Sequence, residues 1–143
     1  MITEIKILIE SVEDGELKKP LYPVEYEENR MMNLKADEKT LDAAFAYIEE
    51  FTQGSYTRDK FVPQKTTQVQ IYFCRFTELE TSAVEREAIR SQIESEIIFP
   101  FMKAYNESGV FDRVDSWKFY TPLPRFDANE ISIMLQFNCK QNF

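Results

Sequence analysis

The side chains of this sequence offer little of the usual equipment for catalysis. Its 143 residues include no histidine. This absence removes the commonest general base, the Ser–His and Cys–His pairs, and the usual ligand of catalytic zinc. The two cysteines, Cys74 and Cys139, lack the paired spacing of a structural zinc site. We interpret both as small buried side chains, reduced as in a cytoplasmic protein.

Carboxylates are abundant, with 25 Asp and Glu residues. A general acid–base pair needs one carboxyl group in an apolar pocket, where its pKa is raised. Only Glu49 and Glu50 qualify as candidates, because Ile48 and Phe51 flank them. Solvent-facing charges beside core positions are the favoured interpretation of this pair.

Two further acidic groups could bind a hard cation, namely Glu27 with Asn29 and the Asp37-Glu38 pair. Neither has the spacing of an EF-hand loop. We therefore assign no catalytic, cofactor-binding or metal-ligating residue, and we expect no cofactor and no enzymatic activity.

The overall composition narrows the class of protein. The net charge of −8 disfavours nucleic acid as a partner, and three glycines cannot build a glycine-rich phosphate loop. No apolar stretch has the length of a membrane span, and the N-terminal segment lacks the pattern of a signal peptide. We expect one domain over residues 1–143, in the cytoplasm and without a membrane partner.

Hydrophobic periodicity predicts two helices. Residues 2–12 fit a helical stripe, although a strand also fits, and we favour a helix that begins near Thr3 and ends at a turn over residues 13–15. A longer helix runs from Ser82 to Glu107, with a Ser82–Glu85 capping box and a left-handed stop at Gly109. Pro100 should kink this helix. The expected buried stripe of the long helix is Ile89, Ile93, Ile97, Phe101 and Ala104.

Alternating residues predict the strands. In Gln68–Phe76, Val69, Ile71 and Phe73 point to the core, while Tyr72 and Phe76 point to the other face, where this chain or a neighbour covers them. A short strand carries Trp117, Phe119 and Thr121. The closing strand carries Ile131, Ile133, Leu135, Phe137 and Cys139, with Ser132, Gln136 and Asn138 outward. The last two strands should form a hairpin. Residues 21–26 are predicted to be extended, because a proline restricts the residue before it. Met31, Met32 and Leu34 are predicted to lie in an edge strand or a loop.

Residues 40–51 fit both a helix and a strand. Ala43, Ala44 and Ala46 favour a helix, which Gly54 could end. Phe45, Tyr47, Glu49 and Phe51 alternate as in a strand. The residues themselves leave both alternatives open.

Six successive apolar residues, 97–102, lie within the long helix. They cover more than one turn, so they cannot all face one core. Either this part of the helix is buried on several sides, or Ile98 and Met102 reach a surface that joins another subunit.

Short patterns follow one another in a recognisable order after the first helix: Leu21-Tyr22-Pro23 with Asn33-Leu34, Phe45-Ala46-Tyr47-Ile48-Glu49 before Gly54-Ser55-Tyr56, Val69-Gln70-Ile71-Tyr72-Phe73, Glu107-Ser108-Gly109-Val110-Phe111, and the strand from Ile131 to Cys139. This order resembles small bacteriophage or prophage tail proteins of the tail-terminator or head–tail joining class. Pro100 and the acidic stretch over residues 25–30 depart from the pattern.

The resemblance implies an α+β fold with a mainly antiparallel sheet packed against one long kinked helix, and a strand over residues 45–51. It also implies a non-catalytic subunit that self-associates and contacts other tail or head-joining proteins, located in the virion if phage-encoded. The alternative is a host-encoded α+β module that binds an apolar ligand or a protein partner.

Overall fold

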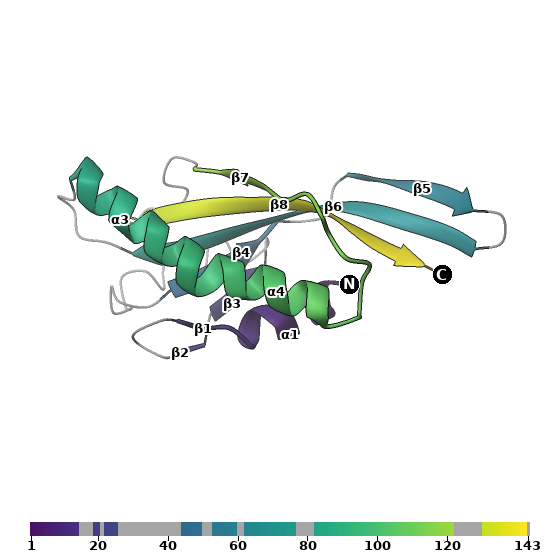
Figure 1. The fold of residues 1–143 in the computed structure, drawn as a ribbon, viewed down its shortest axis with the longest axis horizontal. Coiled ribbons are helices and arrows are strands. Elements are labelled where there is room, and N and C mark those ends of the chain that lie inside the picture. The colour runs from purple at the N-terminus through teal and green to yellow at the C-terminus, as the bar shows by residue number, and fades with distance from the viewer. Residues whose placement is uncertain are drawn as a thin grey trace.

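The computed structural model describes residues 1–14, 19–20, 22–25, 44–49, 53–59, 62–76, 82–121 and 130–142. It has the predicted α+β fold (Figure 1). The helical elements are α1 (Ile2–Glu10), α3 (Ala83–Ile93), η3 (Glu94–Ile98) and α4 (Phe99–Glu107). The strands are β1 (Glu13–Asp14), β2 (Lys19–Pro20), β3 (Tyr22–Glu25), β4 (Ala44–Ile48), β5 (Gly54–Asp59), β6 (Val62–Phe76), β7 (Lys118–Tyr120) and β8 (Glu130–Asn142).

One sheet forms around the long strand β6. Its order is β3-β4-β6-β8-β7, and β5 pairs with the first half of β6. All neighbouring strands in it are antiparallel except β3 and β4, which are parallel. β6 and β8 pair from Gln64 with Asn142 to Phe76 with Glu130. The predicted antiparallel pairing of the last two strands is confirmed.

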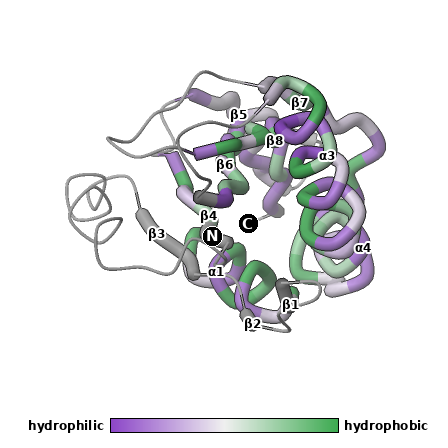
Figure 2. Tube along the Cα trace, turned by 90° about the vertical axis from the view of Figure 1, so that its left-hand side faces the viewer, coloured by the Kyte–Doolittle hydropathy of each residue, from purple (hydrophilic) through white to green (hydrophobic). Residues whose placement is uncertain are grey.

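The main core lies between the sheet and the helices. Val69, Ile71 and Phe73 of β6 are buried, as the alternation predicted. They pack with a cluster that includes Ile5 and Ile9 of α1. In Figure 1, α3 and α4 run continuously along one side of the sheet, and Figure 2 shows hydrophobic and hydrophilic segments alternating along α1 and α4.

The long helix is interrupted by one π-helical turn, η3, just before Pro100. Pro100 has no N–H, so the Glu96 carbonyl loses its helical donor. The Phe99 N–H donates to the Glu94 carbonyl, five residues back, which is the hydrogen bond of a π-helix. The helix is therefore distorted just before Pro100 by one turn that holds more residues than an α-helical turn. The Ser82 cap accepts from the Glu85 N–H at 3.2 Å, and Gly109 has a φ of 70°, so both predicted helix ends are confirmed.

The π turn changes which residues are buried. Ile93, Ile97 and Phe101 are fully buried as predicted, and Ile89 is half-buried. The stripe then continues to Tyr105, which is fully buried, while Ala104 is only half-buried. The prediction for Ala104 was therefore wrong by one position, because the extra residue in the wide turn rotates the last part of the helix.

The opposite face of the sheet is also covered at one end. Tyr47, Tyr72 and Cys74 are buried there, with the Tyr47 and Tyr72 rings 5.9 Å apart. Ser132 lies on this face, as the outward prediction had it, but its side chain is buried. Alternation correctly placed it opposite the core, but it could not indicate whether the second face is covered.

The strand expected over residues 45–51 is present over residues 44–48, against the local helix propensity; Glu49 follows it, and residues 50–51 lie outside the described residues. The predicted turn over residues 13–15 begins instead with the short strand β1, and β7 is shorter than the predicted alternation. The extended conformation predicted for residues 21–26 is confirmed for residues 22–25, which form β3. The predictions for Met31, Met32, Leu34 and the Phe76 side chain lie outside the described residues.

Candidate interaction groove

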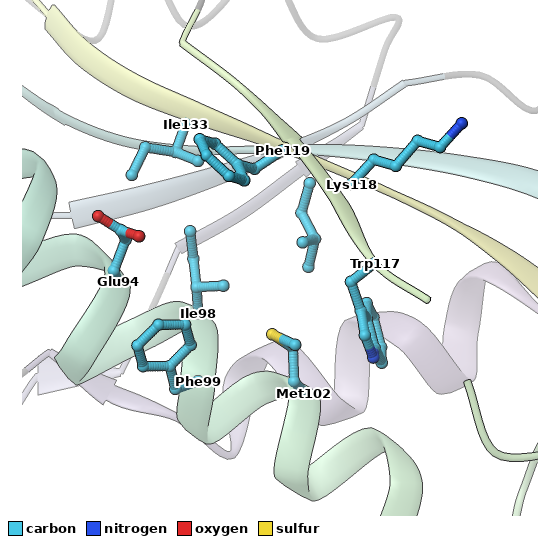
Figure 3. A pocket seen from close by; sticks show the side chains of 9 residues that line it. Glu94, Ile98, Phe99, Met102, Trp117, Lys118, Phe119 and Ile133 are labelled. Carbon is cyan, nitrogen blue, oxygen red and sulfur yellow. The ribbon is translucent and has the colours of Figure 1, made fainter. Parts of the chain in front are cut away.

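An apolar groove opens between the long helix and the sheet edge formed by β7. Its volume is about 250 Å³. The lining residues come from η3, α4, β7 and its flank, and β8: Glu94, Ile98, Phe99, Met102, Trp117, Lys118, Phe119, Ile133 and Leu135. In Figure 3, Phe119 and Ile133 on the strand side face Ile98, Phe99 and Met102 on the helix side, and Lys118 points away. We call this feature the groove.

The helix wall of the groove is a consequence of the π turn. Ile98 is 3% exposed and so belongs to the core, whereas Phe99 is 55% exposed. Of the two alternatives for residues 97–102, burial holds for Ile98, and Phe99 is the residue of this stretch that reaches the surface. Met102 is half-buried. The wide turn brings Ile97 and Ile98 together into the core, and this leaves the next aromatic side chain outside.

Hydrogen bonds hold the strand wall in place. The Asn106 side chain accepts from the Val114 N–H at 2.9 Å and donates to the Val114 carbonyl at 3.2 Å. The same carbonyl accepts from Trp117 Nε1 at 3.1 Å. The Trp117 ring also packs on Phe137 with centroids 4.6 Å apart. These contacts position Trp117 at one end of the groove and direct the chain into β7.

Phe119 is the most exposed aromatic side chain of the groove, at 67%. It pairs with Leu135 of β8, which is buried on the helix side of the sheet. Because paired residues share a face, Phe119 projects on that side. The sequence marked Phe119 as part of an alternating strand, but nothing in the alternation indicated that the strand would lie at an edge.

A second exposed feature lies at the far end of the sheet. β5, residues 62–66 of β6 and residues 140–142 of β8 extend beyond α4 as a three-stranded ribbon (Figure 1). Residues 54–58 are all exposed, and Tyr56 reaches 78%. The Lys65 ammonium lies 5.9 Å from the centroid of the Tyr56 ring. We call these three segments the ribbon.

Of the two residues that the sequence nominated for catalysis, Glu49 is described, and it does not line the groove. Glu49 is half-buried just after β4, where its N–H donates to the Gln70 carbonyl at 3.0 Å. Glu50 and the possible cation ligands Glu27, Asn29, Asp37 and Glu38 lie outside the described residues. Among the described residues, no group of three or more Cys, Asp or Glu side chains could hold a metal ion.

Both cysteines are buried thiols outside any disulfide, as predicted. Burial raises the pKa of the Cys139 thiol. Burial also raises the pKa of the neighbouring Tyr105, with a further contribution from Cys139 itself. A raised thiol pKa lowers the thiolate fraction at neutral pH, so this environment is unlike that of a reactive cysteine.

A buried carboxylate that the sequence did not single out lies at the start of β8. Glu130 is 1% exposed and pairs with Phe76, on the face opposite the main core. It directly precedes the strongly alternating residues of β8, and no sequence signal distinguishes it from an ordinary strand-end charge. Glu130 does not line the groove.

Comparison with protein-family models and with curated proteins gives no match for this chain. Within the residues that the structure describes, no helix is both long and apolar enough to cross a membrane.

Proposed function

We propose that the protein is a non-catalytic assembly subunit that self-associates and joins parts of a phage or prophage tail, as tail-terminator and head–tail joining proteins do. The observation that carries the proposal is the groove, where Phe99 and Phe119 remain 55% and 67% exposed around an apolar hollow. Clustered exposed aromatic residues are typical of protein interaction sites. The resemblance in element order supplies the tail context.

The size of the groove favours a protein partner over a small ligand. Pockets for drug-sized ligands usually enclose about 300 to 1,000 Å³. The groove, at about 250 Å³, is smaller. A hollow of this size suits one large apolar side chain, which is how aromatic anchors bind at interfaces.

A host-encoded module for a small apolar ligand is the second candidate. The apolar lining of the groove by Ile98, Met102 and Leu135 favours it. Such a module would remain monomeric, and an apolar dye that fluoresces on binding should saturate one site and raise the melting temperature.

Sedimentation velocity over a wide concentration series separates the two candidates. An assembly subunit should show a weight-average sedimentation coefficient that rises with concentration, and Phe119→Asp should reduce this rise. A wild-type chain that stays monomeric at every concentration, while binding the dye at one site, would replace the assembly proposal with the ligand module.

A further inference from the structure

We propose that copies of this chain join head to tail through their sheet edges, with β5 of one copy alongside β7 of the next and Tyr56 seated in the groove. The inference rests on the proposed self-association and adds the two surfaces that form the joint. The occupant of the groove is a second copy of this chain.

Both strands are edges of the same sheet. Among the described strands, β5 pairs only with β6, and β7 pairs only with β8. Each therefore has one side whose backbone groups face no described strand, which is the arrangement that accepts an added strand. β5 spans Gly54–Asp59, so it is long enough to cover all of β7, Lys118–Tyr120.

Strand polarity fits a simple repeat. Across the sheet, β5 is antiparallel to β6, β6 is antiparallel to β8, and β8 is antiparallel to β7. β5 and β7 of one copy therefore run in opposite directions. A second copy placed beside the first in the same orientation would present its β5 antiparallel to β7, and the antiparallel sheet would continue from copy to copy.

The side chains also project on matching faces. Tyr56 pairs with Lys65, and Lys65 lies two residues before Thr67 and four before Val69 of the core face. Tyr56 therefore lies on the helix side of the sheet, as Phe119 does. In the continued sheet the Tyr56 ring would become a cross-strand neighbour of Phe119 and would enter the groove opposite Phe99. Cross-strand aromatic pairs of this kind stabilise a sheet.

Charge favours contact between the ribbon and the body of another copy. The ribbon contains three basic residues, Arg58, Lys65 and Lys140, against one acidic residue, Asp59, and so carries a net charge of +2. The whole chain carries −8. The other described residues carry 8 basic and 14 acidic side chains, a net charge of −6, and the groove itself is lined by Glu94 and Lys118. A positive projection on a negative body disfavours contact between two bodies and steers the ribbon to the body of a neighbour.

A complementation experiment tests the joint. Tyr56→Thr removes the anchor and Phe119→Thr removes the groove wall, and threonine keeps the strand propensity at both positions. Val84→Thr is the matched control, because Val84 is 78% exposed on α3 and does not line the groove. Circular dichroism and thermal unfolding establish that each variant is folded before its sedimentation is measured.

We expect each groove or ribbon variant alone to be monomeric at concentrations where wild type and the Val84→Thr variant associate. An equimolar mixture of the Tyr56→Thr and Phe119→Thr chains should form dimers and nothing larger, because only one intact joint remains per pair. If wild type associates but either variant does so equally well, or the mixture stays monomeric, the joint is wrong while the assembly proposal stands. If wild type itself never associates, the assembly proposal fails as well.

Discussion

The side chain of Asn106 and the backbone of Val114 form a reciprocal pair of hydrogen bonds, 2.9 Å and 3.2 Å long, across eight residues of sequence. This pair fastens the segment after α4 to the end of the helix. Trp117 Nε1 donates to the same Val114 carbonyl, so the two elements that form the groove are connected through one residue. The shape of the groove therefore depends on Asn106.

We predict that Asn106→Ala lowers the free energy of unfolding by about 1–3 kcal/mol, because the Val114 N–H loses its acceptor and the Val114 carbonyl keeps only Trp117 Nε1. Trp117 is the only tryptophan, so its emission should shift to longer wavelength as its surroundings loosen. Urea unfolding and fluorescence provide the measurements. Asn138→Ala, at an exposed position of β8, should change stability by less than about 0.5 kcal/mol. Equal effects of the two substitutions would contradict the role given to Asn106.

Gly54 should tolerate no side chain. A Cβ at this position would lie 2.4 Å from the Thr66 carbonyl oxygen in the paired strand. Gly54→Ala must therefore displace β5 from β6, and we expect the free energy of unfolding to fall by about 1–3 kcal/mol. Self-association should also weaken, because β5 carries Tyr56. Urea unfolding and sedimentation velocity measure the two effects.

Gly109→Ala is the matched comparison for Gly54→Ala. Gly109 has a φ of 70°, but a Cβ there would meet no atom within 4 Å. Gly109→Ala should lower the free energy of unfolding by about 1–2 kcal/mol, because alanine is strained in this left-handed backbone conformation. Self-association of the Gly109→Ala chain should equal that of wild type under conditions where both are folded. A Gly54→Ala chain that associates as well as the Gly109→Ala chain would show that the position of β5 does not matter to assembly.

Stability should fall at alkaline pH. Burial raises the pKa of Cys139 in the folded protein, whereas an unfolded cysteine titrates near about pH 8.5. The unfolded chain therefore loses its thiol proton first, so this contribution to stability is complete below that pH and is lost as pH rises through the folded pKa. Tyr105, whose pKa is also raised, adds a second loss above about pH 10.

Urea midpoints measured from neutral to alkaline pH test this dependence. Cys139→Ala should lower the midpoint at pH 7, because it leaves a cavity, and should also flatten the first part of the alkaline decline. Tyr105→Phe should flatten the later part. An alkaline decline that keeps the same slope in both variants would mean that other groups control it.

Much of the fold could be predicted from local sequence. The alternation in Val69, Ile71 and Phe73 identified a core strand, and the Ser82 cap with Gly109 bounded the long helix. Residues 44–48 were different, because their alanines favour a helix while tertiary pairing with both β3 and β6 stabilises a strand. Pairing across the sheet is not encoded in local propensity.

The groove could not be predicted in the same way. The proline in the helix was recognised, but its effect is a π turn that buries Ile98 and exposes Phe99, a rotation that helical periodicity does not contain. The burial of Ser132 likewise depends on what covers the second face of the sheet. Edges and covered faces arise only when the strands are assembled, so the exposed aromatic residues became recognisable as a site only in the structure.

Hydrogen–deuterium exchange at low and high protein concentration tests the central claim most directly. If copies join through their sheet edges, amides in residues 54–59 and 118–120 should exchange more slowly at high concentration, while amides of the exposed first turn of α3 should not change. Protection that does not depend on concentration in both edge strands, or that appears only in other segments, would contradict the claim.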